Sequence, residues 1–204
     1  MATAILEMQI TEEADMAKTS TTTRAAAALK GVDRVVLTGF MGSGKSTLGA
    51  VLAEQLGWRF LDLDGEIESR DGRSVARIFA ESGEPHFRKL ESAALAALLG
   101  RRRVVLALGG GAPEELGNRL LLEQTPRTAV VYLAAPFAAL VARCQEQPGA
   151  AERPVLADLS VAERRFKARR RLYERIASHT VSTAELSVEQ TVAAVLQMLA
   201  KRLG

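Results

Sequence analysis

The amino-acid sequence predicts an α/β protein, a three-layer α/β/α sandwich around a central parallel sheet of about five strands. Short apolar runs alternate with longer segments of helical periodicity, which is the pattern of a parallel sheet covered by helices on both faces. The 204 residues are enough for one such domain, and 48% hydrophobic and 25% charged side chains are ordinary values for a globular protein.

The first 31 residues differ in composition from the rest of the chain. Small and polar residues dominate there, including an unbroken run of serine and threonine at 19–23. Terminal segments of this composition bury little apolar surface and are commonly disordered. We therefore predict that residues 1–31 form a flexible N-terminal extension and that residues 32–204 form the folded domain.

Short apolar runs predict the strands of the sheet. The first run ends at a glycine-rich loop, and the third leads directly into three glycines. Continuous apolar runs of this length are typical of parallel strands that are covered on both faces. The predicted strands are 35–38, 59–62, 104–108, 129–133 and a short last strand at Val181.

The periodic segments predict helices, and one segment without periodicity predicts a loop. The last helix begins at Ser187 with a capping-box pattern and repeats its apolar residues at helical spacing. Residues 145–159 contain two prolines and a glycine, so we predict a loop that could close over a site, a lid. The predicted helices are 46–56, 74–82, 87–99, 136–144, 161–177 and the segment from Ser187 onward.

The segment from Gly39 to Ser46 matches G-x-x-x-x-G-K-[ST] between a predicted strand and a predicted helix. Its glycines let backbone N–H groups surround a phosphate, and the helix N-terminus adds partial positive charge. Lys45 is expected to reach the β- and γ-phosphates, and the Ser46 hydroxyl to ligate Mg²⁺. The motif predicts a P-loop fold that binds a nucleoside triphosphate through Gly42, Ser43, Gly44, Lys45, Ser46 and Thr47. The compact chain favours a small-molecule phosphotransferase.

Two carboxylates, Asp62 and Asp64, follow the second predicted strand, at the sheet edge where parallel α/β proteins place their ligands. One of them can orient Mg²⁺ through water, while the other meets the hydroxyl that attacks phosphorus. The alternative is a helix that simply starts with acidic residues, since Glu66 and Glu68 follow.

These motifs together resemble those of the shikimate kinase family, over residues 34–199. The phosphate loop alone is shared by many kinases, whereas the aspartate pair, the Phe-Arg pair and the triple glycine form a specific combination. The matching segments are 39–47, 60–64 with Ile67-Glu68, Ile78-Phe79 with Gly83-Glu84, Phe87-Arg88 with Glu91, Gly109-Gly110-Gly111, and Arg153-Pro154.

The resemblance implies phosphorylation of the 3-hydroxyl of shikimate with ATP and Mg²⁺, a step toward aromatic amino acids. It gives catalytic roles to Lys45, Asp64 and the lid residue Arg153, and Asp64 also holds the shikimate hydroxyls. Asp62 orients the metal through water, together with Ser46. Arg143 packs on adenine, and Arg153 also contacts the nucleotide.

The resemblance also implies the residues that bind the substrate. Arg88 is one of two arginines that hold its carboxylate, which suits a fork of donors that faces two oxygens. Arg169 has the offset of the second, although the run Arg169-Arg170-Arg171 leaves the choice open. Gly109, Gly110 and Gly111 bring backbone N–H groups against the substrate.

The composition excludes several other classes of function. One cysteine and two histidines exclude an internal disulfide and argue against a cysteine or histidine metal cluster. A net charge of +3 does not favour nucleic-acid or membrane binding, and no apolar run is long enough to span a membrane. The 21 arginines against 6 lysines fit anion binding or a GC-rich genome.

We therefore expect a soluble, cytoplasmic, monomeric enzyme that acts on a small molecule. Two alternatives stay open on these residues. One is a gluconate or other sugar-acid kinase on the same scaffold, and the other is a module that senses shikimate without catalysis.

Overall fold

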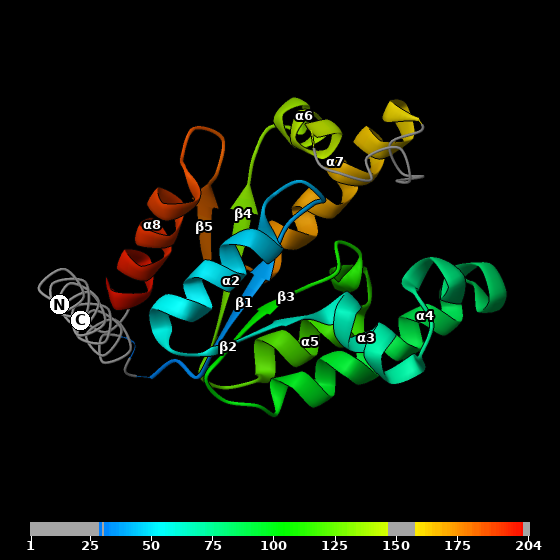
Figure 1. Cartoon of the computed structure of the whole chain (residues 1–204), viewed down its shortest axis with the longest axis horizontal. Coiled ribbons are helices and arrows are strands. Elements are labelled where there is room, and N and C mark those ends of the chain that lie inside the picture. The colour runs from blue at the N-terminus through cyan, green and yellow to red at the C-terminus, as the bar shows by residue number, and fades with distance from the viewer. Residues whose placement is uncertain (1–28, 30, 147–157, 202–204) are drawn as a thin grey trace, which may run out of the picture.

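The computed structural model describes residue 29, residues 31–146 and residues 158–201. Most of the predicted extension and most of the predicted lid, including Arg153, lie outside the described residues. Within the described parts the predicted α/β/α sandwich is confirmed, because helices cover both faces of a single central sheet (Figure 1).

The sheet has five strands in the order β2-β3-β1-β4-β5, and each neighbouring pair is parallel. The central strand β1 is buried along its whole length and pairs Leu37 with Ala107 of β3 and with Val131 of β4. The carboxyl ends of β2, β3 and β1 therefore lie side by side. The strands are β1 (Arg34–Thr38), β2 (Arg59–Asp62), β3 (Val104–Ala107), β4 (Thr128–Ala134) and β5 (His179–Ser182).

Side chains of β1 alternate between two cores, as the pleat of a strand requires. Val35 and Leu37 pack with α2 and α8 on one face, whereas Val36 packs with α3, α4 and α5 on the other (Figure 1). A third cluster joins the phosphate loop to α6 and α7. The α-helices are α2 (Lys45–Leu56), α3 (Leu63–Asp71), α4 (Val75–Leu99), α5 (Leu116–Gln124), α6 (Phe137–Glu146), α7 (Leu159–Ile176) and α8 (Val188–Lys201).

The structure differs from the predicted elements on the acceptor side of the sheet. Helix α4 runs through the predicted gap between two helices, with a break at Gly83, whose φ is 78° and ψ is 170°. Helices α3 and α5 and the short 3₁₀ helix η1 (Ala112–Glu114) were not predicted. The acidic helix start that the sequence left as an alternative is present as α3, which begins immediately after β2.

The packed domain includes residues before the first strand. Leu29 falls inside the predicted extension, yet it is 3% exposed and belongs to the same core cluster as Val32 and the buried face of α8. Among the described helices, none has the length and hydrophobicity that crossing a membrane requires.

Candidate active site

The phosphate loop joins β1 to α2 and leaves the N-terminus of that helix open to an anion. Gly42 and Gly44 have φ values of 75° and 87°, which glycine adopts without strain. A side chain at Gly42 would also collide with the carbonyl oxygen of Leu140 in α6. Helix α2 has no side-chain cap and no acidic residue in its first turn, so its free N–H groups and its dipole favour a phosphate.

Lys45 folds back over the loop that carries it. Its Nζ donates hydrogen bonds to the carbonyl oxygens of Gly39, at 2.7 Å, and Phe40, at 3.1 Å. Burial lowers the pKa of Lys45 to about 8, against the opposing effect of Asp64 and Asp62, which both stabilise the charged ammonium. The ammonium therefore lies between the phosphate loop and the two aspartates.

Asp62 links the phosphate loop to the acceptor side. Its Oδ2 accepts a hydrogen bond from Ser46 Oγ at 2.8 Å, and its Oδ1 accepts one from the backbone N–H of Asp64 at 3.1 Å. The second bond caps α3 and ends the strand at Asp62. The two aspartates therefore do not project from one strand, because Asp64 already lies in the first turn of a helix.

Asp64 lines a cavity together with residues of the phosphate loop. Burial raises its pKa, the negative charge of Asp62 raises it further, and Lys45 opposes both effects. Its Oδ1 is buried and has no hydrogen-bond partner among the described residues. A cavity of about 420 Å³ is lined by Lys45, Asp64 and Arg169, with further residues of the phosphate loop and of the triple glycine.

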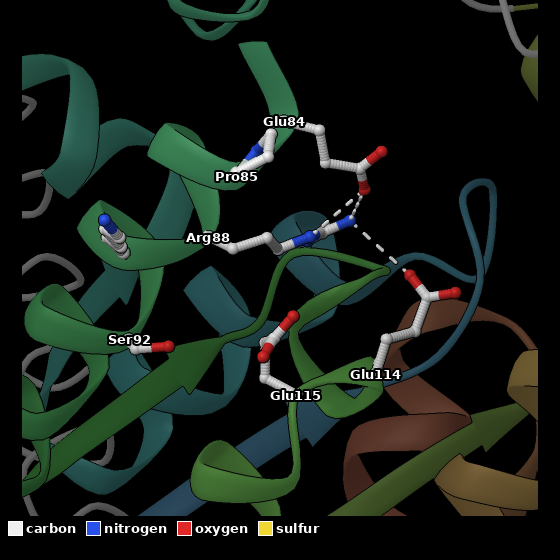
Figure 2. Close-up of a pocket in the computed structure, with 7 residues that line it drawn as sticks. Glu84, Pro85, Arg88, Ser92, Glu114 and Glu115 are labelled. Carbon is white, nitrogen blue, oxygen red and sulfur yellow. Dashed lines mark hydrogen bonds and ion pairs between the residues drawn. The ribbon is translucent and has the colours of Figure 1, made fainter. Parts of the chain in front are cut away.

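Arg88 projects from α4 toward three glutamates, of which Glu84 and Glu114 are drawn in Figure 2 and the third is the buried Glu91. Its Nη1 donates to Glu91 at 2.7 Å, and its Nη2 lies 2.8 Å from Glu84 and 3.4 Å from Glu114. Glu91 is 1% exposed, and burial raises its pKa to about 7 although Arg88 opposes this shift. The guanidinium is thus fixed from one side by a buried carboxylate and from the other by two more exposed ones.

The structure separates the three consecutive arginines of α7. Arg169 is 14% exposed, lines the cavity with Asp64, and places its Nη2 2.7 Å from Glu114 Oε2. Arg170 is 59% exposed and pairs with Glu174 along the helix, and Arg171 is exposed as well. Arg169 is therefore the arginine of this run that the fold brings to the candidate site, close to Arg88 through their common neighbour Glu114.

The three glycines after β3 make room for side chains of the site. A Cβ on Gly109 would lie 2.8 Å from Asp64 Oδ1 and 2.9 Å from Glu91 Oε1, and a Cβ on Gly111 would lie 2.5 Å from Arg88 Nη2. Gly110 accepts a hydrogen bond at its carbonyl oxygen from the Tyr173 hydroxyl at 2.6 Å. Close approach of the acidic and basic side chains therefore requires glycine at two of these positions.

A second cavity, of about 260 Å³, lies on the other side of the phosphate loop. Arg143 lines it, and its guanidinium donates to the hydroxyl of Thr183 at 3.0 Å and to the carbonyl oxygen of the same residue. Gly42, Gly44 and Leu186 line it as well. A flat guanidinium held in this way beside the phosphate loop offers a surface on which a base can stack.

Comparison with known proteins identifies the family. The family model described as shikimate kinase matches residues 41–200, which is most of the chain. The chain belongs to the shikimate kinase family. The matched residues run from the phosphate loop to the last helix and so include both cavities described above.

Two individual shikimate kinases align with this chain over nearly their whole length. The chain is 39% identical to the shikimate kinase of Geobacter metallireducens, over 84% of this chain and 94% of that protein. It is 42% identical to that of Streptomyces avermitilis, over 82% of this chain and 96% of that protein.

Solved structures show the same relation. The shikimate kinase of Acinetobacter baumannii, in complex with shikimate, superposes with a TM-score of 0.79 and 34% identity, over 87% of this chain and 98% of that one. A gluconokinase from Sinorhizobium meliloti shares the fold at a TM-score of 0.58 and 23% identity, over 84% of this chain and 95% of that one.

The sequence did not indicate every residue that the site assembles. Glu84 and Glu91 belong to the family pattern, but their contact with Arg88 was not predicted. Glu114 and Thr183 lie outside the motifs, and no local pattern marks them. Each becomes recognisable only through an arginine that is distant in the sequence.

Proposed function

We propose that this member of the shikimate kinase family transfers the γ-phosphoryl group of ATP to the 3-hydroxyl of shikimate, giving 3-phosphoshikimate and ADP. The observation that carries the proposal is the cavity of about 420 Å³, because the phosphate loop, Asp64 and Arg169 all line it. A phosphate donor and a carboxylate-bearing alcohol bound in this one space would meet beside Asp64. The product belongs to the route toward aromatic amino acids.

The donor phosphates are held by the loop and by Lys45. Gly42, Ser43, Gly44 and the first residues of α2 present backbone N–H groups to them, and the helix dipole favours their charge. To reach them, the Lys45 ammonium exchanges its bonds to two loop carbonyls for phosphate oxygens. Negative phosphates then favour its charged form, despite the burial that lowers its pKa to about 8.

Asp64 is the residue beside the attacking hydroxyl. The 3-hydroxyl oxygen forms a bond to the γ-phosphorus, its proton passes to the Asp64 carboxylate, and the bond from phosphorus to the bridging oxygen breaks to release ADP. A carboxylate whose pKa is raised by burial is a better proton acceptor near neutral pH than an ordinary aspartate. Arg153 of the lid stabilises the charge of the transferring group.

The oxygen donors at the loop fit Mg²⁺. Ser46 Oγ and Asp62 Oδ2 lie 2.8 Å apart, and hard oxygen ligands of this kind suit the ion. Among the described residues no group of three or more acidic, histidine or cysteine side chains is placed to hold a metal ion. Ser46 would hold Mg²⁺ directly and Asp62 through water, and the ion would neutralise charge on the phosphate oxygens.

Arg88 and Arg169 hold the substrate carboxylate at the far end of the acceptor. Glu114 joins these arginines, whose Nη2 atoms lie 3.4 Å and 2.7 Å from its Oε2. Arg143 stacks on the adenine. All these residues come from one chain, so we propose a monomer that acts on small molecules in the cytoplasm.

Release of ADP by the purified protein, with Mg²⁺, ATP and a panel of acceptors, tests this function. We expect turnover with shikimate and none with gluconate. Turnover with gluconate alone would establish a sugar-acid kinase, and binding of shikimate without ADP release would establish a sensing module.

The variant Asp64→Ala tests the role of the proposed proton acceptor. We expect turnover to fall by about a hundredfold or more, since a positioned acid–base group contributes at least that factor. Binding of ATP, measured by calorimetry, should persist because the loop and Lys45 are intact. Full activity in this variant would refute the role given to Asp64.

A further inference from the structure

The arginine pair of the acceptor site already binds a carboxylate that belongs to the chain. Oε2 of Glu114 lies 2.7 Å from Nη2 of Arg169 and 3.4 Å from Nη2 of Arg88. One oxygen thus bridges two guanidinium groups that come from different helices, α7 and α4. A substrate carboxylate that engages both arginines needs the same position.

The backbone of Glu114 is fixed, whereas its side chain is free to leave. The residue ends η1, its N–H donates to the carbonyl oxygen of Gly111 at 2.8 Å, and its own carbonyl oxygen accepts from Arg119 at 2.9 Å. The side chain is 38% exposed, and in the described part of the chain its ion pairs are those with Arg88 and Arg169. Rotation into the neighbouring cavity of about 800 Å³, which Glu114 and Arg88 line, would release both arginines.

Charge repulsion explains why the carboxylates of Glu114 and of the substrate would not occupy the arginine pair together. Glu84 also pairs with Arg88, so a substrate carboxylate would join the carboxylates of Glu84 and Glu114 around two guanidinium groups, with the buried Glu91 close by. Like charges at this separation disfavour each other. In addition, Arg169 Nε is buried without an acceptor among the described residues, so Glu114 satisfies only one edge of that guanidinium. A bidentate carboxylate can satisfy more of it.

We propose that Glu114 is an internal competitor for the acceptor carboxylate and a determinant of acceptor specificity, an inference that rests on the proposed function. A carboxylate-bearing acceptor displaces Glu114 and takes over both arginines. A neutral polyol cannot make this exchange, so the arginine pair stays bound to Glu114. The competitor therefore lowers the affinity for acceptors that carry a carboxylate and leaves the affinity for neutral analogues unchanged.

The variant Glu114→Gln tests the inference because it keeps the shape and removes the charge. Glu115→Gln is the matched control, since Glu115 lines the same cavity and no dashed line joins it to Arg88 (Figure 2). We expect Glu114→Gln to lower KM for shikimate about three- to tenfold, the factor that two partly exposed ion pairs supply. Its kcat should stay within about twofold of the parent value, and the control should leave KM near that of the parent.

The neutral methyl ester of shikimate provides the second arm of the experiment. Its dissociation constant, measured by calorimetry, should be the same for the parent protein and for Glu114→Gln, because the ester does not compete for the arginines as an anion. A raised KM in Glu114→Gln would refute the inference and make Glu114 a support for Arg169. Equal KM values in the two glutamine variants, or equal gains for acid and ester, would refute it as well.

Failure of the proposed function is recognised separately. If the parent protein releases no ADP with shikimate, the assignment of the acceptor is wrong. The same two variants are then compared with gluconate, whose carboxylate is subject to the same competition. An equal dissociation constant for gluconate in both variants would overturn the role of Glu114.

Discussion

At the scale of single residues, burial outweighs pairing for two acidic groups on the acceptor side, Glu91 and Asp64. Glu91 contacts Arg88 at 2.7 Å, which stabilises its carboxylate, yet loss of hydration outweighs that contact and raises its pKa to about 7. Asp64 lies close by and its pKa is raised by the same cause. Glu91 therefore gains or loses its proton around neutral pH, next to Arg88.

The raised pKa of Glu91 should make the free energy of unfolding depend on pH. The folded protein holds the Glu91 proton up to a pKa of about 7, whereas the unfolded chain releases it near the ordinary value of 4.5. This contribution to stability is complete below pH 4.5 and is lost as the pH rises to about 7. Over the whole window it amounts to about 3 kcal/mol at most.

The variant Glu91→Gln cannot titrate and measures that loss directly. Its free energy of unfolding in urea, relative to the parent, should rise between pH 5 and pH 8, by an amount on the order of 2–3 kcal/mol. Subtraction of the parent removes the contributions of other groups that titrate in the same range. Parallel pH profiles for the two proteins would show that Glu91 is ionised in the folded state.

At the scale of elements, the turn after β3 determines how closely the acidic and basic side chains approach. Gly109 and Gly111 lie against Asp64, Glu91 and Arg88 at distances that leave no space for a Cβ. The site therefore depends on the shape of this turn in addition to any contact of its N–H groups with the substrate.

The variant Gly109→Ala should reduce both stability and turnover. Its methyl group would lie 2.8 Å from the buried Oδ1 of Asp64, and relief of that contact should cost about 1–3 kcal/mol in the free energy of unfolding. Displacement of Asp64 should lower kcat as well. Gly110→Ala is the control for stability, since its Cβ would meet the Tyr173 hydroxyl at an ordinary 3.6 Å. Equal losses of stability in the two variants would contradict the steric explanation.

The elements that the sequence predicted are those whose signal is local. The strands are continuous apolar runs, and α8 shows both a capping box and an amphipathic period. Helix α3 was missed because Leu63 and Ile67 are its only buried residues, so its start depends on the cap from Asp62 rather than on a periodic pattern. The break at Gly83 was expected as a gap between helices, which the positive φ of that glycine explains.

The candidate site was predictable only where a motif marks it. Lys45, Ser46 and the aspartates follow from the phosphate loop and the family pattern, and their proximity is found in the structure. Glu114 was not predictable, because it contacts arginines that are 26 and 55 residues away along the chain. The sequence could not distinguish the three arginines of α7 either, because only the packing of that helix shows which of them faces the site.

At the scale of the whole molecule, the core that supports the phosphate loop extends to both ends of the described chain. Leu29 and Val32 pack in one cluster with α2 and α8. The packed core therefore includes Leu29, whereas the sequence alone predicted that the flexible extension ends at residue 31.

Two truncations test this boundary. A chain that starts at residue 29 should melt at the same temperature as the full chain, because residues 1–28 are predicted to be a flexible extension. A chain that starts at residue 33 should lose about 3 kcal/mol of stability, since it lacks the buried side chains of Leu29 and Val32. Equal melting temperatures for the two truncated chains would show that Leu29 and Val32 do not contribute.

The residues of the candidate site fall into two groups, one held by the sheet and one carried by elements outside it. Asp62, the triple glycine and the phosphate loop follow adjacent strands, so the sheet itself fixes their spacing at about 5 Å per strand. The arginines and Glu114 are carried instead by α4, α7 and η1, which lie outside the sheet. On the proposed roles of these residues, we expect substitutions on the outer elements to change which acid is bound and to leave the phosphate-binding residues in place. The same parallel sheet can in this way support kinases with different acceptor specificities.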